Sequence, residues 1–294
     1  MLIREFLEKR YSAREYEQKQ LSESTIKTIV DYAHEIEASI KSVKVKFIFL
    51  KDGAEIFEKL NGYAGYAGVM IKSPHYIGIL TEDENYRTQI AASYAMQSLI
   101  KKLFEMGLGT CWIDFSKAGE RLQDELAGSE LKNINYAVSV GYPKKESRFK
   151  FVYVPSTSYS SVSNNPYRQI SESKSDKSGE RLPIDQFVFK DEFGKHISLD
   201  ELEQRGLADV FSRVRNAPSA RNLQPWRFVL QNERIIIAVK NPSSKESMTD
   251  AGIMMYLFEG MVHDSGIRGE WSLLPFEEFE YQNDKYAYVG EFRV

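Results

Sequence analysis

The chain has 294 residues, a length that fits about two domains of ~150 residues each. Its formal net charge of −3 gives no reason to expect nucleic acid as a partner. Hydrophobic residues make up 42% of the chain, including 17 Phe and 17 Tyr, which is ample for a packed core. The single cysteine, Cys111, excludes an intrachain disulfide and fits a reducing compartment.

The first nine residues mix acids and bases and lack the apolar core of a signal peptide. No run approaches the ~18 apolar residues of a membrane span. We therefore expect a soluble, cytoplasmic protein that contacts neither nucleic acid nor membrane. The histidines at positions 34, 75, 196 and 263 show no metal-ligand spacing, so no metal is expected.

The first half of the chain alternates helical and strand patterns. We predict a short helix over residues 3–9, and Ser22 is placed to cap a second helix in which Ile26, Ile29 and Ala33 recur at helical spacing. By the same criteria we expect strands over residues 43–50, 76–80 and 136–140, and a long, largely apolar helix over residues 86–106 that ends at Gly107.

An internal repeat emerges when the two halves are aligned. The alignment places Leu50 on Leu230, residues 76–80 on 235–239, residues 107–112 on 266–271, and Val140-Gly141 on Val289-Gly290. Each match is weak, but all of them follow the same order along the chain. We therefore predict two copies of one α+β unit, at residues 1–155 and 181–294, joined by a Ser/Lys-rich connector at 156–180. The second copy lacks the insertion at residues 51–71.

Three motifs carry candidate chemistry. Arg10 and Arg14 are four residues apart, so both guanidiniums could converge on a phosphate, with Ser12 donating a further hydrogen bond. Residues 107–112, Gly-Leu-Gly-Thr-Cys-Trp, follow a helix and lack the G-x-G-x-x-G spacing of a dinucleotide fingerprint. Residues 216–228 present Ser219, Asn222 and Gln224 on a loop that Pro225 leads into an apolar strand. A solvated basic face, a helix stop and an ordinary polar turn are the respective alternatives.

Together these motifs resemble the nitroreductase family of FMN-dependent oxidoreductases, in particular its R-x-S-x-R, G-L-G-T-C-W and P-S-x-x-N-x-Q-P-W segments. The resemblance implies an α+β fold with a mainly antiparallel sheet flanked by helices. It also implies FMN-binding residues at Arg10, Tyr11, Ser12, Arg14, Thr110, Cys111, Trp112, Arg148, Pro218, Ser219 and Asn222, with Asp114 as a further candidate.

Family members are typically homodimers with FMN at the subunit interface, so a duplicated chain would act alone as a pseudo-dimer. The first copy retains R-x-S-x-R and the second retains the Gln-Pro-Trp loop, which predicts one FMN per chain. In the implied reaction, hydride passes from NADH or NADPH through flavin N5 to a small acceptor such as a nitroaromatic or a quinone. The cofactor carries the chemistry, and no protein acid or base is nominated.

Two alternatives stay open, namely an FMN-binding protein without turnover and a non-flavin interaction protein that keeps only the fold. Residues 63–68 are either a mobile flap over the substrate or a plain glycine-rich loop. Cys111 lies in an apolar segment, which favours a buried small residue over a redox nucleophile.

Overall fold

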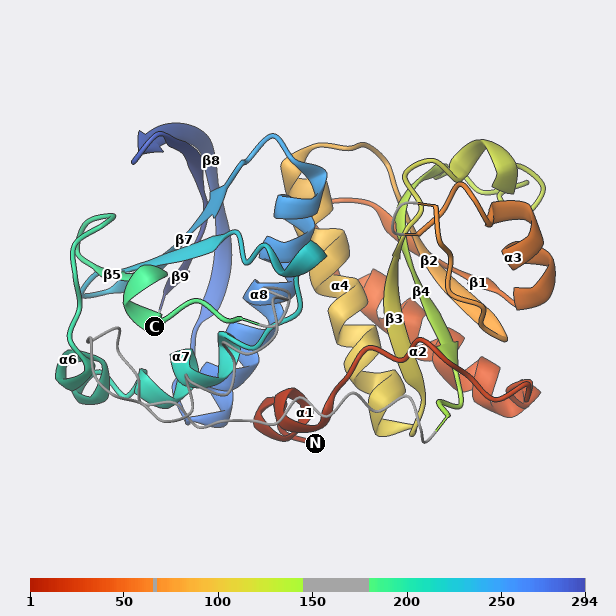
Figure 1. The fold of residues 1–294 in the computed structure, drawn as a ribbon, viewed down its shortest axis with the longest axis horizontal. Helices are drawn as coiled ribbons and strands as arrows, with labels where there is room; N and C mark the ends of the chain where they lie inside the picture. The colour runs from red at the N-terminus through yellow and green to blue at the C-terminus, as the bar shows by residue number, and fades with distance from the viewer. Residues whose placement is uncertain (66–67, 145–179, 294) are drawn as a thin grey trace, which may run out of the picture. The chain divides into compact units, whose positions relative to one another are not determined.

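The computed structural model describes residues 1–65, 68–144 and 180–293. The chain divides into two compact units (Figure 1). Unit one comprises Met1 and Glu8–Val152, and unit two comprises Leu2–Leu7 and Tyr153–Val294. Each unit holds a largely antiparallel sheet flanked by helices, so the predicted fold class is confirmed. None of the helices in the described ranges is long and apolar enough to cross a membrane.

The sheet of unit one has four strands, all antiparallel, in the order β1-β2-β4-β3. Its strands are β1 (Val45–Leu50), β2 (His75–Thr81), β3 (Gly109–Asp114) and β4 (Asn133–Gly141), and its helices are α2 (Glu23–Ser39), α3 (Gly53–Leu60), α4 (Tyr86–Glu105) and the 3-10 helix η1 (Gly119–Leu122). All the strands and helices predicted for this half are present, with ends shifted by three residues or fewer.

Local sequence fixes where the helices of unit one begin and end. The Ser22 side chain accepts a hydrogen bond from Thr25 N at 3.1 Å and starts α2, which buries Ile29, Ala33 and Ile36. The chain leaves α4 through Gly107, whose φ of 76° lies in the left-handed region.

The insertion at residues 51–71 contributes packing on the sheet face opposite α2. Asp52 caps α3, and Ile56 and Leu60 of this helix are buried against a cluster that includes Tyr76 and Phe115. Phe47 and Ile77, on the strand positions of opposite parity, line a pocket beneath α2. Both faces of the unit one sheet are therefore covered.

Unit two has a five-stranded sheet in the order β5-β6-β7-β9-β8, with β5 parallel to β6 and the other pairs antiparallel. Its strands are β5 (Val188–Lys190), β6 (Trp226–Leu230), β7 (Arg234–Lys240), β8 (Glu270–Tyr281) and β9 (Asp284–Arg293); its helices are α6 (Leu199–Gln204), α7 (Ala208–Val214), α8 (Lys245–Asp264) and the 3-10 helices η4 (Ile184–Gln186) and η5 (Ala220–Asn222).

The first helix, α1 (Ile3–Lys9), forms where the sequence predicts it but packs mainly with unit two. Arg4 Nη2 donates to Asp209 at 2.6 Å, and Arg4 N donates to Asp264 at 2.9 Å. Gly260 leaves room for Ile3, since a Cβ there would lie 2.2 Å from the Ile3 Cγ1. Residues 2–7 therefore pack with the second half of the chain, although the predicted first copy includes them.

Four strands of each sheet share one order, β1-β2-β4-β3 in unit one and β6-β7-β9-β8 in unit two. Phe47 lies opposite Ile79, after which the β2–β4 register shifts, and Phe228 lies opposite Ile237, after which the β7–β9 register shifts. Aligned on these irregularities, Phe47 corresponds to Phe228.

The two ladders also agree at the far edge. Trp112 lies opposite Val138, and Trp271 lies opposite Phe292. The helices α4 and α8, between the second and third ladder strands, each have 20 residues. The observed register agrees with the predicted alignment of residues 107–112 with 266–271. It differs from the predicted alignment of β1 with β6 by one residue, and from that of β4 with β9 by several residues.

Candidate functional site

The R-x-S-x-R segment runs along the outer edge of β3 in unit one. Ser12 forms a parallel bridge with Thr110, and Ala13 N donates to Thr110 O at 2.9 Å. Further on, Tyr16 forms an antiparallel bridge with Pro143. These backbone contacts bring two of the three predicted motifs together, since Thr110 belongs to the Gly-Leu-Gly-Thr-Cys-Trp segment.

A buried tyrosine holds this segment in place. The Tyr16 hydroxyl contacts Ala13 O at 2.8 Å and lies 2.7 Å from Ser139 Oγ, which in turn lies 3.3 Å from Cys111 O. Burial raises the pKa of Tyr16, so its phenol stays protonated. The sequence reasoning missed this residue. The available signal was Ser139, a polar side chain within an otherwise apolar strand.

The side chains of the motif form a basic cluster. Arg10 Nη2 donates to Ser12 Oγ at 3.4 Å, and the positive charges of Arg14 and Arg10 both act to lower the pKa of the Cys111 thiol. Burial lowers the pKa of the Arg10 guanidinium to about 10, an effect that the nearby Cys111 partly offsets. Within the described part of the chain, no ion pair joins Arg10 or Arg14 to a carboxylate. By contrast, Arg4 pairs with Asp209 at 2.6 Å.

Cys111 lies beneath this cluster with 9% of its surface exposed. Burial raises the pKa of its thiol, and the charges of Arg14 and Arg10 and a hydrogen bond with Ser12 offset this only in part. A neutral, buried thiol agrees with the interpretation of Cys111 as a small packing residue.

Thr110 and Trp112 alternate with Cys111 along β3 and are partly exposed. The Trp112 ring packs edge-on against Tyr136, with centroids 6.1 Å apart. Its indole Nε1 is buried and finds no hydrogen-bond acceptor among the described residues. Such a donor favours an additional acceptor at this position. Tyr11 is partly buried, and Arg148 lies outside the described residues.

The third motif forms a strained loop in unit two, between α7 and β6. Arg221, Asn222 and Gln224 have φ values of 50°, 57° and 48°, all in the left-handed region that non-glycine residues rarely adopt. The Ser219 Oγ accepts a hydrogen bond from Gln224 N at 3.1 Å and so closes the loop. Pro218 and Ser219 are both partly exposed on it. Strain of this kind is characteristic of functional loops.

Two amide side chains of the loop bind a neighbouring chain segment. The Gln224 side chain is buried, donates to Glu180 O at 3.0 Å and accepts from Leu182 N at 2.9 Å. Asn222 Nδ2 also donates to Glu180 O, at 2.8 Å. Arg181 Nη1 donates to Ala217 O at 2.8 Å. The segment around residues 180–182 therefore supports the loop from one side.

A buried carboxyl group on α8 supports the loop from below. Both Asp250 side-chain oxygens lie within 3.0–3.1 Å of Ala220 N. Burial raises the pKa of Asp250 well above its usual range; the hydrogen bond from Ala220 N opposes this shift, and Glu246 adds to it. Sequence reasoning missed this residue, although an acid inside the apolar stretch from Met248 to Met255 was a usable signal.

A family profile described as "Putative TM nitroreductase" matches residues 2–262. The chain belongs to this nitroreductase family. The predicted resemblance is thus confirmed. None of the curated proteins matches the sequence.

Among solved structures, the chain is similar to a "putative nitroreductase" from Thermotoga maritima, with 17% identity, a TM-score of 0.51, and coverage of 98% of this chain and 94% of that chain. This likeness supports the nitroreductase fold.

Two further matches are an FMN-dependent nitroreductase from Clostridium difficile (22% identity, TM-score 0.38, covering 52% of this chain and 98% of that chain) and a nitroreductase with bound FMN from Bacteroides fragilis (16%, 0.42, 55% and 98%).

Proposed function

We propose that this nitroreductase-family chain is an FMN-dependent oxidoreductase that draws its flavin ligands from both units. The observation that carries the proposal is the basic cluster of Arg10, Ser12 and Arg14, which has no carboxylate partner in the described part of the chain. Two guanidiniums and a hydroxyl are the donors that a dianionic phosphate requires. The lowered pKa of Arg10 still leaves it cationic at neutral pH, so the cluster keeps its charge.

The same neighbourhood offers contacts for the rest of a flavin nucleotide. Trp112 Nε1 is a buried donor that lacks an acceptor among the described residues, and Thr110 adds a partly exposed hydroxyl beside it. A flavin ring carries carbonyl and ring-nitrogen acceptors that suit such donors. The donor set of unit one therefore fits FMN. We include Tyr11, Cys111 and Arg148 among the proposed contacts.

Unit two would contribute neutral contacts from its strained loop. Ser219 uses its oxygen as an acceptor for Gln224 N, which leaves its hydroxyl hydrogen for a ligand. Pro218 and Asn222 flank it on the same loop. Because Asp250 and the segment at residues 180–182 hold this loop, its groups are preorganised. We propose Pro218, Ser219 and Asn222 as contacts of the flavin ring and ribityl chain.

When bound, FMN supplies reversible hydride transfer, from NADH or NADPH to a small acceptor such as a nitroaromatic or a quinone. The residues of the chain bind the phosphate, orient the ring and stabilise negative charge that develops on it. No acid or base of the chain is needed for this chemistry.

We further propose that the two units are copies of one ancestral unit, so that the chain acts as a single-chain pseudo-dimer. Their common strand order, matching register shifts and equal helices α4 and α8 support this. The ladder alignment places Glu270 where unit one has Cys111. A carboxylate at that position would repel a phosphate, which favours one FMN per chain.

The decisive experiment is a visible absorption spectrum of the purified chain after incubation with FMN and desalting. Retained bands near ~450 and ~370 nm at about one flavin per chain would support the proposal. Two flavins per chain would contradict the single site, and a colourless protein would favour an interaction protein that keeps only the fold. Anaerobic NADH and NADPH additions follow. Bleaching supports turnover, whereas an unchanged spectrum would leave an FMN-binding protein without turnover.

A further inference from the structure

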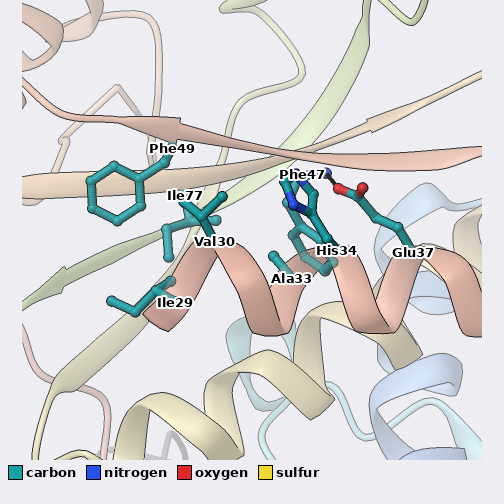
Figure 2. A pocket seen from close by; sticks show the side chains of 8 residues that line it. All are labelled: Ile29, Val30, Ala33, His34, Glu37, Phe47, Phe49 and Ile77. Atoms are coloured by element: carbon teal, nitrogen blue, oxygen red, sulfur yellow. Dashed lines mark hydrogen bonds between the residues drawn. The ribbon is translucent and has the colours of Figure 1, made fainter. Parts of the chain in front are cut away.

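A small apolar pocket lies at the outer edge of the unit one sheet and is lined by none of the motif residues above. It has a volume of about 60 Å³ and opens between α2 and the edge strand β1 (Figure 2). Its lining residues are Ile29, Val30, Ala33, His34 and Glu37 from α2, Phe47 and Phe49 from β1, and Ile77 from β2. The pocket therefore combines an apolar floor with the open edge of a strand.

The edge of β1 carries an unusual hydrogen bond. The Phe47 N–H points away from β2 and donates to Glu37 Oε1 at 2.5 Å, the contact drawn in Figure 2. No strand within the described residues pairs with β1 on this side. A charged side chain thus takes the place that a backbone carbonyl would occupy in a continued sheet.

The corresponding edge of unit two shows what such a position accepts. The ladder alignment pairs β1 with β6, and β6 is covered by the parallel strand β5. Phe228, which corresponds to Phe47, donates its N–H to Phe187 O at 2.7 Å, and Asp191 N donates to Leu230 O at 2.9 Å. A backbone carbonyl here plays the role that Glu37 plays in unit one.

A phenylalanine fills the matching slot in unit two. The Phe187 ring is fully buried and packs edge-on against Phe211 of α7 and Phe228 of β6, with centroid distances of 6.1 and 6.4 Å. Lys190, at the end of β5, forms an ion pair with Glu201. The occupant of this edge is therefore the short strand β5, which is preceded by an aromatic anchor and ends in a base.

We propose that the β1 edge of unit one is a docking site for an extended segment of a partner protein, which adds to the sheet parallel to β1. An aromatic residue of the segment places its side chain in the pocket between Val30 and Phe47. The backbone carbonyl of this residue replaces the Glu37 carboxylate as acceptor for Phe47 N–H. The released Glu37 carboxylate favours a basic residue on the partner. Main-chain hydrogen bonds supply affinity in this mode, and the pocket supplies specificity. The site is independent of flavin binding.

The test uses a fluorescent peptide with the sequence of residues 184–191, added to the full-length protein and followed by anisotropy. We expect saturable binding, weakened about tenfold when Phe187 of the peptide is replaced by alanine, because a buried aromatic anchor dominates such contacts. Val30→Trp in the protein fills the pocket and should abolish binding. Glu37→Ala frees Phe47 N–H and should tighten binding several-fold, whereas Glu35→Ala, on the exposed side of α2, should leave it unchanged.

Four outcomes would overturn the proposal. The peptide fails to bind in a saturable way to the wild-type protein and to Glu37→Ala. It binds equally well to a folded Val30→Trp variant, which would place it elsewhere, for example on β6 after displacement of β5. Glu37→Ala binds no more tightly than Glu35→Ala. The fourth outcome is that the protein alone dimerises as its concentration rises and the Phe49 amide gains protection from hydrogen exchange. A second copy of the chain would then occupy the edge.

Discussion

Each unit contains a four-stranded ladder with the same strand order, but the two units differ in which edge of the ladder is covered by another chain segment. In unit one the segment with Arg10 and Arg14 covers the β3 edge, and no strand of the described residues pairs with the outer side of β1. In unit two β5 covers the β6 edge, and no described strand pairs with the outer side of β8. The ladders share one strand order, so the two units differ mainly in the segments at these edges.

Packing at the covered edge of unit two should contribute far more to the free energy of unfolding than packing at the open edge of unit one. Phe211 is fully buried among Phe187, Phe228 and Phe258. We expect Phe211→Ala to lower the free energy of unfolding of unit two by about 3–5 kcal/mol. Val30→Ala, beside the open pocket, should lower that of unit one by about 1 kcal/mol or less.

Urea denaturation followed by Trp226 fluorescence, with Trp112 as the probe of unit one, would separate the two effects. Equal losses for the two variants would mean that the β1 edge is as well packed as the β6 edge.

Among the proposed flavin contacts, the arginines of unit one should matter most. Arg10→Gln removes a charge-assisted hydrogen bond, worth about 1.5–3 kcal/mol, and should weaken FMN binding by about 10- to 100-fold. Lys27→Gln is the matched control, since Lys27 lies on the exposed surface of α2 in a pair with Asp31. Fluorescence titration of FMN measures both. An Arg10 variant with wild-type affinity for FMN would show that the phosphate does not bind at this cluster.

Most of the ladder was predictable because its signals are local. The Ser22 cap, the helical spacing after it and the breaker Gly107 depend on neighbouring residues, and these elements formed where expected. The three-residue strand β5 has no periodicity of its own and exists because β6 offers it an edge. α3 lies in the insertion at residues 51–71, for which no helix was predicted, although Asp52 provides a normal cap.

The proposed site was predictable only where a motif repeats the family pattern. The resemblance names both Ser12 and Cys111 as flavin contacts, and the structure places a hydrogen bond between their side chains. Tyr16 and Asp250 were missed because their burial results from tertiary contacts, which no local pattern encodes. The residue-level match of β1 and β6 also needed the observed register.

His75 joins two chain segments of unit one through hydrogen bonds, an arrangement called here the His75 clamp. It should make the stability of unit one sensitive to acid in a way that the stability of unit two is not. His75 is buried, with Nδ1 2.6 Å from Lys51 O and Nε2 accepting from Leu21 N at 3.1 Å. Burial and the charge of Lys51 lower its pKa below 6.5, while the hydrogen bond to the Lys51 carbonyl, Asp52 and Glu23 oppose that shift. The neutral ring is favoured by folding, so its contribution is complete above pH 6.5 and is lost as pH falls towards the folded-state pKa.

Unfolding of unit one, measured in urea at pH 7.5 and pH 5.5, should therefore show a loss of stability at the lower pH. The loss should be smaller in His75→Gln and unchanged in His34→Gln, because His34 is exposed. An identical pH response in wild type and His75→Gln would exclude the clamp as its source.

The smallest effect is expected from the loop of unit two, where the proposed contacts are neutral. Ser219→Ala removes the acceptor of Gln224 N and the hydroxyl proposed to meet the flavin, together about 1 kcal/mol. FMN affinity should fall about five-fold, whereas Ser212→Ala, on α7, should change nothing. If Ser219→Ala proved more damaging than Arg10→Gln, recognition of the ring would outweigh recognition of the phosphate. The comparison of the two units would then be reversed, with unit two dominating affinity and the basic cluster only guiding the anion to it.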